Sequence, residues 1–128
     1  MATILRIVLG TILILHGLIH LLGFVAYLRL ATIETLPYRT DLLSGALEVG
    51  EVGARIYGLL WGLAAVGFVA AGVAVFVLLP WWRGLTVLVA LLSLAQPVLG
   101  LPDSPFGVVL NVAILAFVLA GGRMGWLP

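Results

Sequence analysis

The stretch LRIVLGTILILHGLIHLLGFVAYLR, residues 5–29, is long and apolar enough to cross a membrane as a helix, because about 20 apolar residues span the hydrocarbon core. Between its outer arginines it holds two histidines, His16 and His20, one helical turn apart. Gly23 and Tyr27 continue the same stripe along the helix. A polar side chain at this depth normally faces a bundle interior or a cavity. The stretch therefore predicts a membrane helix with one polar face.

The composition of the whole chain agrees with this reading. Hydrophobic residues make up 64% of the 128 residues, charged residues 9%, and the mean hydropathy is +1.33, which is typical of an integral membrane protein. There is no cysteine, which excludes disulfides, thiolate metal ligands and covalent c-type haem attachment. The six basic residues are all arginine and are scattered, so no nucleic-acid surface is expected.

Three further apolar runs follow the first one, so we expect an all-α protein with four membrane helices in a single domain, residues 1–128. The expected helices cover about residues 4–29, 53–79, 84–101 and 105–122, with an extramembrane loop at about residues 30–52. The segments PWWRG, residues 80–84, and GLPDSPFG, residues 100–107, contain the proline and glycine that end helices. These short links predict a four-helix transmembrane bundle with antiparallel neighbours.

The first run is expected to remain as a helix, because it is longer than the apolar core of a cleaved signal peptide. Arg6, Arg83 and Arg123 flank the spans on one side of the membrane, and three arginines flank them on the other. The arginine counts therefore tie. Two arginines of the second group lie among carboxylates, which favours both termini inside (N-in and C-in), and we expect a bacterial inner membrane.

Small residues recur at a spacing of four in the second expected helix, at Ala54, Gly58 and Gly62. This spacing lets helix backbones approach closely in lipid. We expect these three residues to pack helices within the chain. Association of two copies through the same face is the alternative.

Polar residues of several helices are expected to meet in one half of the bilayer. Glu51 and Arg55 are spaced for an ion pair at the start of the second helix. With the alternating helix directions, the third and fourth helices bring Gln96 and Asn111 to the same half. The predicted ligand-binding set, a lipid-accessible polar pocket, is His16, His20, Tyr27, Glu51, Arg55, Trp61, Gln96 and Asn111.

Several chemistries remain open for this cluster. The residues could simply hydrogen-bond one another between helices. A metal would need more than the two histidines, and Glu48, Glu51 or Asp103 would have to complete its ligands, so the metal is unknown. One histidine could ligate haem or a chlorophyll-type pigment. A quinone requires least, namely a hydrogen-bonding histidine and an apolar slot, and is the favoured cofactor. No catalytic residue is predicted, and serine chemistry at Ser44, Ser93 or Ser104 lacks sequence context.

Short motifs resemble known membrane proteins. The runs LRIVLGTILILHGLIHLLGF, EVGEVGARIYGLLWG and LAGGRMG are similar to DoxX-like proteins, although His20 stands where that pattern tends to have lysine. The HGLIHLLGF start and the spacing of Asp103, Phe106, Gly107 and Asn111 more closely resemble a group of small uncharacterised four-helix bacterial membrane proteins. The DoxX-like group includes subunits of a thiosulfate:quinone oxidoreductase, and this resemblance implies a redox accessory role with a quinone nearby.

The sequence thus predicts a small integral membrane accessory or binding subunit, without enzyme activity of its own. The alternatives are a quinone-linked membrane redox component and a purely structural subunit of a larger complex. The expected partners are membrane lipid and either other membrane subunits or further copies of the chain, and no nucleic acid.

Overall fold

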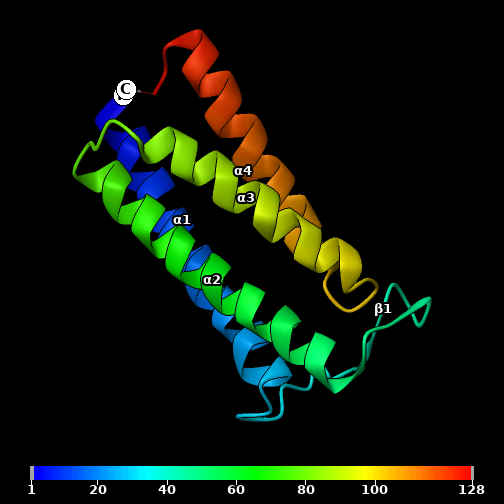
Figure 1. Cartoon of the computed structure of the whole chain (residues 1–128). Helices are drawn as coiled ribbons and strands as arrows, with labels where there is room; N and C mark the ends of the chain where they lie inside the picture. The colour runs from blue at the N-terminus through cyan, green and yellow to red at the C-terminus, as the bar shows by residue number, and fades with distance from the viewer. Residues whose placement is uncertain (1, 128) are drawn as a thin grey trace.

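The computed structural model describes residues 2–127 and contains four long helices. They are α1 (Ala2–Tyr27), α2 (Gly50–Phe76), α3 (Trp82–Leu99) and α4 (Pro105–Met124), and they run antiparallel to their neighbours in sequence (Figure 1). All four are long and apolar enough to cross a membrane. The predicted all-α four-helix bundle of an integral membrane protein is confirmed.

The helix limits follow local sequence signals. α2 begins at Gly50, three residues before the expected start, where glycine takes a positive φ of 67° and donates its N–H to the Glu48 carboxylate. α4 begins with Pro105, whose missing N–H costs nothing in the first turn. It ends at Met124, and the following residue, Gly125, adopts the left-handed conformation common after a helix.

The close helix pairs are α1 with α2, α2 with α3, and α3 with α4. At the seam between α1 and α2, glycines bring the backbones together. A Cβ on Gly17 would lie 2.8 Å from the Ala65 carbonyl oxygen, and a Cβ on Gly72 would lie 2.8 Å from the Gly10 carbonyl oxygen. Such contact is how helices associate where lipid supplies no hydrophobic drive.

Two apolar clusters make up the described core. The larger joins all four helices and includes Leu13, Phe68, Val89, Ile114 and Val118. The smaller lies under the connection between α1 and α2 and includes Ala26, Tyr27, Leu42, Ala54 and Tyr57. His16 and His20, described below, lie between these clusters in the sequence of α1.

The connection between α1 and α2 is more ordered than the predicted loop. It carries a two-stranded antiparallel pair, β1 (Asp41–Leu42) and β2 (Leu47–Glu48). The Leu43 N–H donates to the Leu99 carbonyl at 2.7 Å, so this pair is fastened to the end of α3. Strands of two residues are too short to leave a recognisable sequence pattern.

The two ends of the bundle differ in charge. The end where α1 begins and α4 finishes carries Arg6, Arg83 and Arg123, and we term it the arginine end. The opposite end carries the α1–α2 connection and the α3–α4 turn. It holds three arginines and all five acidic side chains of the chain, and we term it the carboxylate end; the acids are Glu34, Asp41, Glu48, Glu51 and Asp103.

Candidate functional site

Four polar side chains from three helices meet inside the bundle, on the side of its middle nearer the carboxylate end. His16 and His20 come from α1, Ser93 from α3 and Asn111 from α4, and all four are buried. The two imidazole rings meet edge to face with centroids 4.5 Å apart. Phe68 packs on His16 with a centroid distance of 4.6 Å. The stripe predicted from the sequence therefore does face the bundle interior.

Hydrogen-bond geometry assigns the proton positions on both rings. His20 Nδ1 lies 2.9 Å from the His16 carbonyl oxygen, which can only accept, so Nδ1 carries the hydrogen. In the neutral ring Nε2 is then an acceptor, and the Ser93 hydroxyl donates to it. The Asn111 amide donates to the Gly107 carbonyl at 2.9 Å, which leaves its Oδ1 to accept from His16 Nε2–H at 3.4 Å. Two imidazolium charges at this distance would repel each other, so the form with both rings charged is disfavoured.

The two histidines therefore differ in how firmly hydrogen bonds hold their rings. Both nitrogens of His20 have short partners, so ligating a metal or haem iron through this ring would break an existing bond. The His16 bond to Asn111 is longer than the usual 2.7–3.2 Å range, so His16 Nε2–H is the donor that can most easily be redirected. The Ser93 hydroxyl is fully buried, so its contact with histidine does not present a nucleophile to a substrate.

A second group of buried side chains continues the polar layer toward the carboxylate end. Tyr57 donates its hydroxyl to the Gln96 carbonyl, and the Gln96 amide donates to the Leu60 carbonyl at 2.8 Å. Buried polar atoms without a hydrogen-bond partner among the described residues include His16 Nδ1, Trp61 Nε1 and Gln96 Oε1. Such atoms are rare in folded proteins and mark places where a function is a reasonable hypothesis.

A groove of about 250 Å³ opens beside this layer, and we call it the α1–α4 groove. Its polar lining is contributed by both helices and by the segments at the carboxylate end: His16, His20, Thr35, Asp103, Ser104 and Asn111. Its apolar and aromatic walls include Ile19, Leu22, Trp61 and Phe106. Since the histidines are 3% and 2% exposed, they form the floor of the groove, and the walls provide most of its surface.

The structure brings half of the predicted ligand-binding set to this groove, namely His16, His20, Trp61 and Asn111. Gln96 is buried in the protein but does not line it. Tyr27 is buried under the α1–α2 connection.

Glu51 and Arg55, the predicted contributions of the second helix to the pocket, do not line this groove. Both are exposed on the surface of α2. The predicted Glu51–Arg55 ion pair is also absent from the described residues, where Glu51 pairs with Arg29 at 3.6 Å. The turn of the chain after α1 brings Arg29 back toward α2, and helical spacing within α2 carries no information about that turn.

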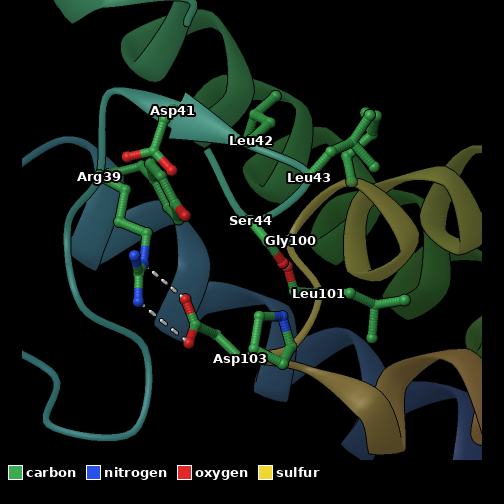
Figure 2. Close-up of a pocket in the computed structure, with 11 residues that line it drawn as sticks. Arg39, Asp41, Leu42, Leu43, Ser44, Gly100, Leu101 and Asp103 are labelled. Atoms are coloured by element: carbon green, nitrogen blue, oxygen red, sulfur yellow. Dashed lines mark hydrogen bonds and ion pairs between the residues drawn. The ribbon is translucent and has the colours of Figure 1, made fainter. Parts of the chain in front are cut away.

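Asp103 connects the groove with the α1–α2 connection. Its carboxylate accepts hydrogen bonds from Arg39 at 2.8 and 3.5 Å, as the dashed lines in Figure 2 show. The cavity beside this ion pair measures about 10 Å³, which is room for no more than a water molecule. The Arg39–Asp103 pair is therefore a structural fastening, and sequence reasoning missed it because the two residues are 64 positions apart.

The residues that the sequence assigned to helix packing face α1. Ala54 is completely buried. A Cβ on Gly58 would lie 2.8 Å from the Tyr27 Cβ, and a Cβ on Gly62 would lie 2.6 Å from the Phe24 ring. The small residues of α2 therefore pack against α1 of the same chain.

The described residues contain no group of three or more His, Asp and Glu side chains that could hold a metal ion. What the site offers is an apolar groove with a redirectable N–H donor on its floor and hydroxyl groups near its outer end. The chain matches no family model, no curated protein and no solved structure.

Proposed function

We propose that this protein is a small membrane-embedded binding subunit that takes an amphipathic molecule from the bilayer into the α1–α4 groove. The observation that carries this proposal is the groove itself, with apolar walls and a polar floor at one depth of the bundle. Ligand sites have this character, a mainly apolar cavity with a few placed polar groups. The polar part of the ligand would lie toward His16 and Asn111, and its apolar part along Ile19 and Leu22.

The flanks of the groove support access from lipid. Ile19 and Leu22 on α1 are 54% and 44% exposed, and Phe106 on α4 is 85% exposed. In a bundle that spans the membrane, exposed apolar side chains at this level contact acyl chains. Because α1 and α4 are not among the closely packed helix pairs, a ligand can move between them without separating a tight seam.

The experiment that tests this proposal is to purify the protein in mild detergent and identify its stoichiometric small molecules by mass spectrometry. The groove-filling variant Leu22→Trp should lose the bound molecule. Leu15→Trp is the matched control, because Leu15 is also exposed on α1, at 55% against 44% for Leu22, but does not line the groove. Equal small-molecule content in wild type and both variants would contradict the proposal.

A quinone is the second candidate reading, as the ligand of a membrane redox component, and one observation favours it. The His16 Nε2–H has a long bond to Asn111 and can turn to a carbonyl oxygen of a ligand. In this reading the ring lies near Trp61 and His20, and the isoprenoid tail leaves through the flank between α1 and α4. The resemblance to DoxX-like proteins supports the same reading. A quinone retained by wild type and by His16→Gln, but lost from His16→Phe, would support donation at this position.

We further propose the N-in and C-in orientation in a bacterial inner membrane. At the carboxylate end Arg29 is paired with Glu51 and Arg39 with Asp103. At the arginine end, no arginine forms an ion pair with a described residue. Arginine-bearing ends are retained preferentially on the cytoplasmic side, and we take the end whose arginines have no carboxylate partner among the described residues to be that side.

A further inference from the structure

A second groove lies at the arginine end, between α3 and α4, and it measures about 550 Å³. We call it the α3–α4 groove. It is separate from the α1–α4 groove and shares no lining residue with it. Two arginines, Arg83 and Arg123, line it. Its apolar lining comes from both helices and includes Val87, Leu91, Val118 and Leu119.

The lining of the groove changes from charged to apolar with depth in the membrane. Arg83, Val87 and Leu91 succeed one another on α3 at intervals of one turn, so the groove runs from a charged surface level to apolar side chains about 12 Å deeper. On α4 the order from the surface inward is Arg123 and then Leu119. An anionic group next to a hydrocarbon chain therefore complements the groove along its length.

The charge at this end has no counterpart among the described residues. All five acidic side chains lie at the carboxylate end, and neither Arg83 nor Arg123 forms an ion pair with a described residue. An anion bound at this end would balance that charge. Anionic lipid headgroups attract arginines placed at the membrane surface.

The guanidinium group of Arg83 is held in position. One of its nitrogens, Nη2, donates to the Leu127 carbonyl oxygen, and the group lies 5.4 Å from the Trp82 ring centroid. Another, Nη1, lies 3.4 Å from the point where a Cβ on Gly122 would stand. A cation fixed before binding loses little conformational freedom when an anion arrives. The first turn of α3 starts beside it without a side-chain cap, which also favours an anion.

We propose that the α3–α4 groove binds one anionic phospholipid, with its phosphate at Arg83 and Arg123 and an acyl chain along Val87, Leu91 and Leu119. The bound lipid completes the charge balance of the arginine end. This site is independent of the proposed ligand of the α1–α4 groove.

Native mass spectrometry of the whole chain in detergent tests the site, with phosphatidylglycerol and phosphatidylcholine of identical acyl chains as probes. Wild type should retain one phosphatidylglycerol in preference to phosphatidylcholine. Arg83→Gln and Arg123→Gln should each weaken phosphatidylglycerol binding roughly tenfold, as expected for one charged hydrogen-bond partner. Arg6→Gln is the control, because it removes the same charge from the same end but does not line the groove.

Three results would overturn the proposal. The first is equal retention of the two lipids by the wild-type protein. This result does not depend on whether the variants fold. An equal loss in Arg6→Gln would mean that binding follows net charge. Displacement of the lipid by glycerol phosphate at the same concentration would mean that the arginines bind a free anion and that the apolar walls contribute nothing.

Discussion

At the scale of single residues, His16 and His20 look equivalent in the sequence but are held differently. His20 has a partner at each ring nitrogen, whereas His16 has one long bond and one nitrogen without a partner among the described residues. A fully bonded buried group stabilises the helices that it joins, and a partly bonded one can change partner. The bonds of His20 hold α1 against α3, and we propose that His16 is the histidine that contacts the ligand of the α1–α4 groove.

Ser93→Ala should destabilise the bundle, because it removes the hydroxyl that donates to His20 Nε2 and leaves a buried acceptor without a partner. Hydrogen bonds between membrane helices contribute about 0.6 to 1.7 kcal/mol, and we expect a loss in this range. Thermal unfolding in detergent, or reversible unfolding in bicelles, measures it.

The control for this change is Ser104→Ala, whose hydroxyl makes a weak 3.5 Å contact in the α3–α4 turn. It should leave the unfolding midpoint nearly unchanged. If the two alanine variants unfold at the same temperature, the Ser93–His20 bond contributes nothing to stability.

The placement of single residues could be predicted where it depends on helical periodicity. The spacing of His16 and His20 put both on the inner face of one helix, and the alternating helix directions brought Asn111 to the same level. The partners of Glu51 and Asp103 could not be predicted, because each pairs with an arginine of the α1–α2 connection. The path of an irregular connection is set by tertiary contacts. Such contacts leave no periodic pattern in a single sequence.

At the scale of elements, α1 and α2 form the closest pair of the bundle. Their contact depends on positions where any side chain would meet backbone, as at Gly17 against the Ala65 carbonyl oxygen. Such a seam cannot adjust by rotating a side chain, because a backbone atom is the obstacle. Changes there must separate the helices.

Gly17→Val should therefore destabilise the α1–α2 pair by about 1 to 3 kcal/mol, the usual cost of overpacking. Gly84→Ala provides the comparison, because nothing lies within 4 Å of the Cβ that it would add in the first turns of α3. That variant should be neutral or slightly stabilised, since alanine is the better helix former. Monodispersity and thermal unfolding report both effects, and similar stabilities would show that the seam is not tight.

The Arg39–Asp103 ion pair joins the α1–α2 connection to the α3–α4 turn. Its side chains are 43% and 18% exposed, so we expect it to contribute no more than about 1 kcal/mol. Asp103→Asn should leave the helices intact and increase amide hydrogen exchange in residues 40–49. Glu34→Gln removes the same charge within the connection and should leave that exchange rate unchanged. Faster exchange throughout the helices of Asp103→Asn would mean that the ion pair stabilises the whole fold and not only the α1–α2 connection.

Elements of regular length were predictable, and short ones were not. The four helices follow from long apolar runs ended by proline and glycine, and their limits differ from the expected ones by a few residues. The β1–β2 pair was missed because it depends on contacts with the end of α3, such as the Leu43 to Leu99 backbone bond. That bond joins segments far apart in the chain.

At the scale of the whole molecule, the absence of cysteine allows a direct test of orientation. Ala46→Cys places a thiol in the exposed connection at the carboxylate end, and Met124→Cys places one at the arginine end. In intact cells a membrane-impermeant maleimide should label the first and not the second, and both after permeabilisation. The opposite pattern would reverse the proposed N-in and C-in orientation.

The separation of charge between the two ends gives the bundle a permanent electric dipole along the membrane normal. One end carries three arginines, and the other carries three arginines and five carboxylates. Moving one elementary charge across the membrane changes the free energy by roughly 2.3 kcal/mol for each 100 mV of membrane potential. The transmembrane voltage, negative inside, therefore favours the orientation with the arginine end in the cytoplasm, although arginine counts alone give both orientations equal weight. Loss of the voltage would weaken that preference in newly inserted chains.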